Sequence, residues 1–290
     1  MVKNGAVMEI RGKVFDFKRT YIMGILNVTP DSFSDGGMFT DSEGAAARAF
    51  EMSGQGADII DIGGESTRPG ADKVSAEEEI KRVIPVIEKI RKKNNEIIIS
   101  VDTYKAETAG KAMDAGADMI NDISGGVFDS RMFKTAAVKK AKYIIMHIKG
   151  TPGNMQDNPV YPRGVVKEIR DFFEAQSLKA VEAGIRKDDI IIDPGIGFGK
   201  TAEDNAVILE NIGEFVSLGF PVMVGTSRKS MIGKATGKDV SERKFGTAAA
   251  VALSISKGAR IVRVHDVVEM KDVVKVSDFI ANSGGKEKVT

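Results

Sequence analysis

The sequence lacks several features whose absence narrows what the protein can do. It has no cysteine among its 290 residues, which excludes disulfide bonds and thiolate chemistry. Its 42 basic and 41 acidic residues leave a formal net charge of +1. These charges are spread along the chain and form no basic stripe of the kind that nucleic-acid binding needs. We therefore expect no nucleic-acid partner.

Long apolar runs are missing as well. No stretch approaches the roughly 18–20 apolar residues of a membrane span. Residues 1–17 carry charges every few positions instead of the apolar core of a secretory signal. These absences predict a cytoplasmic protein without a membrane partner.

Eight short apolar runs are present instead, and each ends in a cluster of small or polar residues. They lie at residues 21–27, 57–64, 97–103, 117–126, 142–147, 189–195, 220–229 and 259–266. Runs such as Ile97–Ile99 and Ile190–Ile192 are apolar on successive residues. This pattern is typical of parallel strands that are buried on both faces.

Segments with helical periodicity separate these runs. A capping box at Ser75–Glu78 opens one such segment, and Gly184 follows another at residues 165–183. Six more lie at 43–54, 105–115, 130–140, 203–217, 242–257 and 268–281. Eight strands alternating with eight helices predict an α/β fold, a closed (β/α)8 TIM barrel. We expect one barrel domain over residues 21–282, and an N-terminal β-hairpin within residues 1–20 that closes the bottom.

The C-terminal ends of the strands surround the ligand site in a barrel of this type. One group of polar residues at these ends offers the donors and acceptors that a flat, nitrogen-rich heterocycle requires: Asp102, Asn121, Asp193 and Lys229. Met146 and Phe198 would supply apolar walls. A second group suits an anion and consists of Asn27, Arg68, Arg263, His265 and the turn at 225–227. The strand ends therefore predict a site for a heterocycle that carries a phosphate or pyrophosphate.

Several nearby residues have structural explanations instead. A single aspartate after a strand is often a helix cap or a turn former, and His147 is equally compatible with a hydrogen-bonded core histidine. Segment 65–70 alone is compatible with a turn and an ion pair. We expect structural roles for Asp58, Asp61 and Asp122, the first two because no partner is evident and the third because it points away from its neighbour. The concentration of polar residues at all eight strand ends is what favours a site.

Several motifs of the chain resemble those of the dihydropteroate synthase family. They are GILNVTPDSFSDGG (24–37), DIGGESTRPGA (61–71), SVDTYKA (100–106), MINDISGG (119–126), DPGIGFGK (193–200), GTSRKSMIG (225–233) and RVHDV (263–267). The resemblance extends over about residues 7–280, in matching order and spacing. The segment HIKGTPGNMQ (147–156) departs from the family pattern at Ile148 and at 153–154, in a loop expected to lie beyond the ligand.

The resemblance implies a transferase of folate biosynthesis. Such an enzyme joins 6-hydroxymethyl-7,8-dihydropterin pyrophosphate to p-aminobenzoate, releases pyrophosphate and forms 7,8-dihydropteroate. The implied mechanism is an SN1-like displacement, with Mg²⁺ as the cofactor that assists loss of pyrophosphate. The resemblance also implies a homodimer and a target of sulfonamides.

The resemblance also implies a role for each site residue. The pterin would contact Asp102, Asn121, Ile123, Met146, Asp193, Phe198, Lys229 and Arg263. The pyrophosphate would contact Asn27, Arg68, Arg263 and His265, with the metal on Asn27. The aminobenzoate pocket would consist of Phe33, Thr67, Arg68, Pro69 and Ser230. Catalytic roles would fall to Asp35, Lys229, Arg263 and His265. Loops 29–37 and 65–70 would act as lids over the reacting groups.

Two other functions remain as alternatives. A pterin-dependent methyltransferase domain would share the barrel and the pterin carboxylates, but it would not need the anion-binding residues. A catalytically silent pterin-binding or scaffold protein would be expected to have lost loop or anion residues, and the expected ones are all present.

Overall fold

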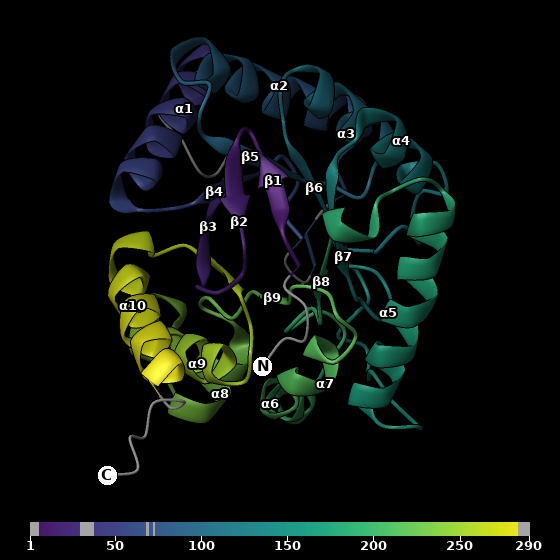
Figure 1. The fold of residues 1–290 in the computed structure, drawn as a ribbon, viewed down its shortest axis with the longest axis vertical. Coiled ribbons are helices and arrows are strands. Elements are labelled where there is room, and N and C mark those ends of the chain that lie inside the picture. The colour runs from purple at the N-terminus through teal and green to yellow at the C-terminus, as the bar shows by residue number, and fades with distance from the viewer. Residues whose placement is uncertain (1–5, 30–37, 68–69, 72, 284–290) are drawn as a thin grey trace.

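The computed structural model describes residues 6–29, 38–67, 70–71 and 73–283 (Figure 1). Within them, eight parallel strands form one sheet: β3 (Tyr21–Asn27), β4 (Ile59–Gly63), β5 (Ile98–Asp102), β6 (Met119–Asp122), β7 (Lys142–Met146), β8 (Ile190–Asp193), β9 (Met223–Val224) and β10 (Ile261–Val264). Their order is β8-β7-β6-β5-β4-β3-β10-β9. A bridge between Ile192 and Val222 links the two ends of that order, so the sheet closes into a barrel. The predicted (β/α)8 fold is confirmed.

Helices surround the strands in an outer ring, as Figure 1 shows. They are α1 (Met38–Gln55), α2 (Ala76–Lys93), α3 (Ala106–Asp114), α4 (Met132–Lys139), α5 (Val165–Glu182), α6 (Ala202–Glu210), α7 (Ile212–Val216), α8 (Ser230–Thr236), α9 (Lys244–Ser256) and α10 (Val267–Ser283). None of the helices among the described residues is both long enough and apolar enough to cross a lipid bilayer.

Local sequence signals explain several helix ends. The Ser75 hydroxyl accepts a 3.1 Å bond from the Glu78 N–H at the start of α2. The Glu78 carboxylate accepts from Arg82, so only half of the predicted capping box forms. A complete capping box opens α6 at Thr201 instead. The expected single helix over 203–217 is divided between α6 and α7, and α8 was not among the expected helices.

Strand residues alternate between two apolar environments. Alternate side chains from the N-terminal halves of all eight strands share one buried cluster inside the barrel: Met23, Ile59, Ile98, Met119, Ile144, Ile191, Met223 and Ile261. Their sequence neighbours pack outward against the helices in a second, larger cluster. Both faces of each strand are therefore buried, which explains why the strands read as continuous apolar runs.

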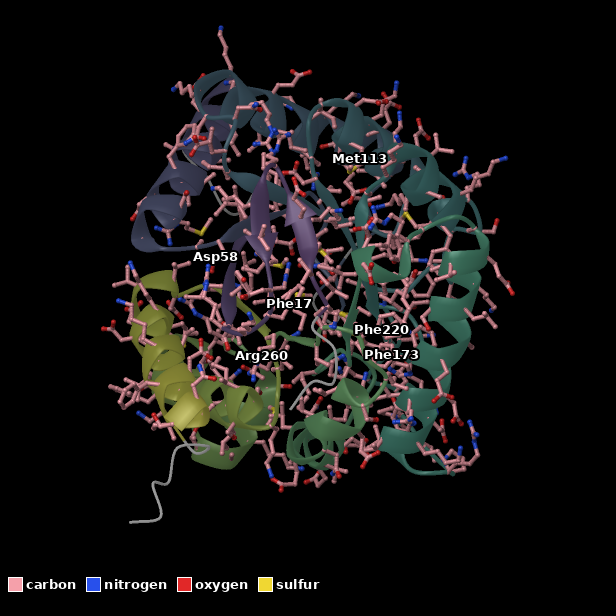
Figure 2. All side chains as sticks on the ribbon, viewed as in Figure 1. Phe17, Asp58, Met113, Phe173, Phe220 and Arg260 are labelled. Atoms are coloured by element: carbon pink, nitrogen blue, oxygen red, sulfur yellow. The ribbon has the colours of Figure 1, made fainter. Side chains whose placement is uncertain are left out.

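The N-terminal hairpin closes one end of the barrel. Strands β1 (Met8–Ile10) and β2 (Lys13–Phe15) pair antiparallel around Arg11 and Gly12, whose positive φ angles of 50° and 73° suit a two-residue hairpin turn. Phe15 and Phe17 belong to the same buried cluster as the inner ring of strand residues. Figure 2 labels Phe17 near the middle of the ring, beside the hairpin. The predicted plug at the bottom of the barrel is therefore present.

Candidate active site

The side chains that face the barrel interior change from apolar to charged toward the C-terminal ends of the strands. On β4, the side chain two residues after the buried Ile59 is Asp61. On β5, Asp102 follows Ile98 by four residues, and on β10 Arg263 follows Ile261 by two. Because side chains on one face of a strand repeat every two residues, the same inward face is apolar at the bottom and charged above it.

Strand register brings several predicted residues to the same height. Asp102 pairs with Asn121 on the neighbouring strand, and Met146 pairs with Asp193. Asn27, the last residue of β3, is opposite Gly63. These residues stand at the C-terminal ends of their strands, as the sequence predicted.

Arg263 is the centre of a buried ionic network. Its Nε donates to Asp61 Oδ2 and its Nη2 donates to Asp102 Oδ2, both at 2.6 Å. The amide nitrogen of Asn121 donates to the same Asp61 oxygen at 2.9 Å. Asp61 is fully buried, and Asp102 and Asn121 are nearly so. Asp61, expected to be a structural aspartate, thus joins Asn121 to the directly bonded pair of Arg263 and Asp102.

The expectation that Asp61 lacks a partner is therefore wrong. No partner is evident near Asp61 in the sequence, because its partners come from β6 and β10, which are distant along the chain. The residues two before and two after it, Ile59 and Gly63, share its face of the strand. That alternation was the signal available in the sequence. By contrast, the structural roles of Asp58 and Asp122 agree with their contacts: Asp58 binds Arg19 at the bottom of the barrel, and Asp122 accepts bonds around the turn after β6.

Burial moves the pKa values of two aspartates and a lysine toward the neutral range, whereas the pKa of the central arginine moves away from it. Desolvation raises the pKa of Asp102 to about 7, although Arg263 opposes the shift and Asp61 adds to it. Desolvation also raises the pKa of Asp193 to about 6, while Lys229 acts against it. The pKa of Lys229 falls to about 8 because of burial and the nearby Arg263. The pKa of Arg263 rises despite its own burial, because Asp61 and Asp102 stabilise the guanidinium.

Asp193 and its loop form the opposite side of the site. The Gly195 N–H donates to Asp193 Oδ1 at 2.7 Å, and this bond holds the carboxylate at the start of the loop. Lys229 Nζ lies 4.1 Å from the centre of the Phe198 ring. Met146 is buried beside Asp193 in the strand register. An ammonium group, an aromatic ring and a thioether therefore surround this carboxylate. A heterocycle needs such a combination of hydrogen-bonding groups and apolar walls.

The predicted anion-binding residues lie on the adjoining strands. His265 follows Arg263 by two residues, directly after the end of β10, and its Nδ1 is 2.9 Å from the Ser227 hydroxyl. Lys229 is the residue that precedes α8, whose first residue is Ser230. Arg228 pairs instead with Asp266 at 2.6 Å, which directs its charge toward α10.

The remaining predicted residues fall into two sets. Asn27 and Thr67 are half-buried, Ser230 is exposed and Ile123 is buried. Phe33, Asp35, Arg68 and Pro69 lie outside the described residues. The structure gives no contacts for this second set, so their expected roles stay predictions.

His147 behaves as a buried core histidine. Its Nδ1 is 3.0 Å from Lys200 Nζ, and the same lysine donates to the carbonyl oxygens of His147 and Phe198. Burial and the Lys200 charge hold the pKa of His147 well below its ordinary value. This pair fastens the end of β7 to the loop after β8 and gives the histidine a structural role.

A second buried ionic cluster lies under the start of segment 65–70. Lys105 pairs with Glu65 and, at 3.1 Å, with Glu79. The Tyr104 hydroxyl donates to Glu65 at 2.7 Å, and Thr108 donates to Glu79 at 2.8 Å. The ion pair that was a possible explanation of this segment therefore exists, and it fixes Glu65, two residues before Thr67.

Comparison with known proteins identifies the family. The model of the pterin binding enzyme family matches residues 23–265. The dihydropteroate synthase of Synechocystis sp. is 51% identical over 269 residues, which are 92% of this chain and 92% of that protein. The chain belongs to the dihydropteroate synthase family. The resemblance seen in the motifs is confirmed.

Solved structures of dihydropteroate synthases share the whole fold. The Yersinia pestis enzyme in a sulfonamide drug complex has a TM-score of 0.89 at 39% identity, covering 95% of this chain and 99% of that one. The Xanthomonas albilineans enzyme with 4-aminobenzoic acid has a TM-score of 0.87 at 40% identity, covering 96% and 98%. Chains of this family are transferases of folate biosynthesis, and both structures match nearly the full length of this chain.

Proposed function

We propose that the protein condenses 6-hydroxymethyl-7,8-dihydropterin pyrophosphate with p-aminobenzoate to give 7,8-dihydropteroate and pyrophosphate. The observation that carries the proposal is the buried network in which Arg263 bridges Asp61 and Asp102, with Asn121 attached. Such a network presents charged and amide groups in a water-poor interior, where a polar heterocycle is recognised by direct hydrogen bonds.

The pterin ring would bind between the two sides of the site. Carboxylates at Asp102 and Asp193 accept from ring N–H and amino groups, and Lys229 donates to a ring carbonyl. Phe198 and Met146 cover the ring from the sides. This assignment rests on the strand register and on the contact between Lys229 and the Phe198 ring. Ile123, buried directly after β6, completes the proposed pterin contacts.

The pyrophosphate would bind beside Arg263 and His265. Two guanidinium nitrogens are engaged by carboxylates, and Nη1 is the remaining one that faces a ligand in this proposal. His265 is held by Ser227 from the loop after β9, and loops after the last two barrel strands are the usual phosphate site of this fold. Arg68, outside the described residues, is proposed as a further cation.

The residues present fit Mg²⁺ as the assisting ion. Among the residues that the structure describes, no three Asp, Glu or His side chains gather as a metal cage. Mg²⁺ commonly uses only one or two protein oxygens together with substrate phosphates. The half-buried Asn27 at the end of β3 supplies one such oxygen. When bound, the ion would neutralise charge on the departing pyrophosphate.

The protein's own groups suit a dissociative, SN1-like displacement. Loss of pyrophosphate leaves positive charge on a carbon conjugated to the electron-rich pterin, and the carboxylates of Asp102 and Asp193 stabilise that charge. The cationic side chains Lys229, Arg263 and His265 assist the leaving anion, and Asp35 is proposed to act from the first loop. The aniline nitrogen of p-aminobenzoate is already nucleophilic, so it requires no strong general base.

The aminobenzoate pocket is proposed at the rim, next to the pterin site. Thr67 is half-buried and Ser230 is exposed at the start of α8. Phe33, Arg68 and Pro69 are proposed to complete it. The related Xanthomonas albilineans enzyme has been solved with 4-aminobenzoic acid, which supports a pocket for this substrate in the family.

A second copy of the chain is the proposed partner. Large apolar side chains are exposed on the neighbouring helices α9 and α10: Phe245, Leu253, Val276, Phe279 and Ile280. Exposed apolar side chains that gather on adjoining helices favour an association surface. Sedimentation velocity should give a dimer for the wild type and a monomer for Phe279→Glu. A monomeric wild type at micromolar concentration would refute the proposal.

Release of pyrophosphate distinguishes the proposed function from its alternatives. A synthase releases pyrophosphate only when pterin pyrophosphate and p-aminobenzoate are both present, whereas a methyltransferase domain or a silent binding protein releases none. The measurement is a coupled pyrophosphate assay with each substrate omitted in turn. Release that does not depend on p-aminobenzoate would indicate simple hydrolysis. Absence of release with both substrates and Mg²⁺ would refute the proposed reaction.

A further inference from the structure

Asp61 occupies a position that no described ligand role explains. It is 0% exposed, yet it contacts two residues proposed to touch the substrate. Its Oδ2 accepts both from Arg263 and from the amide nitrogen of Asn121, at 2.6 and 2.9 Å. A buried carboxylate that serves only the fold would more commonly be tied to backbone N–H groups, as Asp122 is at Ser124 and Gly126.

The contact with Asp61 determines which way the Asn121 amide points. A carboxylate paired with a guanidinium can only accept hydrogen bonds, so it must face the amide nitrogen. The Asn121 oxygen is thereby turned away from Asp61. That oxygen is buried and has no hydrogen-bond partner among the described residues. Because a buried unpaired acceptor costs free energy, it is a group that gains by meeting a donor.

We propose that Asp61 is a positioning residue that fixes Asn121 as a hydrogen-bond acceptor toward the heterocycle, and at the same time orients the Arg263 guanidinium. This inference rests on the proposed function, because it assumes that the ligand is a pterin. It adds a residue that selects a ring N–H or amino donor at this point of the ring. A heterocycle with an acceptor there would face the Asn121 oxygen and be rejected.

The variant Asp61→Asn separates this role from simple packing. The new amide keeps the size of the side chain, and its oxygen can still accept from Arg263. Its nitrogen then donates toward position 121, so the Asn121 amide must rotate and turn its own nitrogen to the ligand. We expect the affinity for 6-hydroxymethyl-7,8-dihydropterin, measured by calorimetry, to fall on the order of tenfold or more, as a mispaired buried polar group predicts.

Exchanging the two side chains should restore binding. In the double variant Asp61→Asn with Asn121→Asp, the amide at position 61 donates to a carboxylate at position 121. The hydrogen bond and the net charge are retained, and position 121 again presents an acceptor to the ligand. We expect pterin affinity within about threefold of the wild type, since every hydrogen bond is kept, with Arg263 now bonded to an amide oxygen at position 61. An affinity no better than that of Asp61→Asn would overturn the proposal.

A matched control exists directly before the same strand, at Asp58. Asp58 also pairs with an arginine, Arg19, at 2.6 Å, and it lies three residues before Asp61. Asp58→Asn removes the charge of one arginine-bound aspartate at the bottom of the barrel. The pterin affinity of this variant should stay within about twofold of the wild type, because distant sites act independently. An equal loss in both single variants would mean a general effect on the fold and would overturn the proposal.

Two further measurements test the inference if the single variant does not fold or if the protein does not bind the pterin. If Asp61→Asn does not fold, the double variant is compared directly with the wild type, and a loss of more than about tenfold refutes the inference. Without any ligand, ¹⁵N NMR should show slow solvent exchange of the Asn121 side-chain amide protons, because they are buried and bonded to Asp61. Fast exchange would refute the inference even if the pterin binds. Failure of the wild type to bind the pterin, with slow exchange retained, would instead refute the proposed function alone.

Discussion

The two ends of this barrel are built from the same strands and have opposite chemistry. On β5, Ile98 points into an apolar layer that contacts the hairpin plug, whereas Asp102 on the same face carries a charge paired with Arg263. The bottom layer is formed by branched and thioether side chains that need no partners. The top layer consists of groups that are stable in the interior only in combination. Stability and function are therefore separated along a strand by a few residues.

Truncation of a side chain in the bottom layer should have the largest effect. It should change the stability of the protein and leave its ligand affinity unchanged. Ile98 is 1% exposed and belongs to the cluster that seals the barrel. Ile98→Ala should lower the free energy of unfolding by about 2–5 kcal/mol, because it leaves a cavity that the barrel cannot fill. Urea unfolding measures the loss, and calorimetry with the pterin alcohol should give unchanged affinity. A variant that is stable but weak in binding would show that the two ends are not independent.

Removal of Arg263 should affect the two ligand parts unequally. We expect Arg263→Ala to weaken binding of the pterin pyrophosphate more than binding of 6-hydroxymethyl-7,8-dihydropterin, the alcohol without pyrophosphate. The difference in binding free energy should be about 1.5–3 kcal/mol, the strength of one charged hydrogen bond. Calorimetry with both ligands measures the difference. The matched control is Arg260, which directly precedes the same strand, donates to the Ala259 carbonyl and is labelled in Figure 2. Equal losses for both ligands would indicate that Arg263 serves only the ring.

Single changes at the heterocycle groups should have a somewhat smaller effect. Asn121→Ala and Asp193→Asn each leave a donor or acceptor of the bound ring without its partner, which costs about 1–3 kcal/mol of pterin affinity. The pterin alcohol isolates this term because it lacks the pyrophosphate. If neither variant changes the affinity, the ring does not bind at these strand ends.

The fold could be predicted from the sequence because its signals are local. Continuous apolar runs, helix caps and turn glycines each specify an element within a few residues. Much of the site could be expected for the same reason, since strand ends meet in a barrel. The division of 203–217 at Asn211 was missed because its side chain bonds back to Val207, a local competition that apolar periodicity does not reveal.

The pairing of side chains across the barrel could not be predicted from the sequence. Asp61 and Arg263 are separated by 202 residues, and nothing near Asp61 signals its partner. Only closure of the sheet brings them together. The heterocycle group and the anion group share one network, because Arg263 of the second is bonded to Asp102 of the first. Long-range contacts of this kind depend on register, which composition and periodicity leave open.

The effect expected to be smallest near neutral pH is a pH dependence of stability that the top layer has and the bottom layer lacks. Burial raises the pKa of Asp193 to about 6 in the folded protein, above the ordinary value of 3.8. Between these values the folded protein binds a proton that the unfolded chain has lost, so the free energy of unfolding falls as pH rises toward 6 and then levels off. One proton contributes at most about 1.4 kcal/mol per pH unit. Asp193→Asn should remove this slope, so its stability relative to the wild type should increase from pH 4.5 to pH 6.5 in urea unfolding. Ile98→Ala, which removes no titrating group, should differ from the wild type by a constant amount. A constant difference for Asp193→Asn as well would mean that Asp193 titrates alike in the folded and unfolded states, and that the top of the barrel is as accessible to water as its surface.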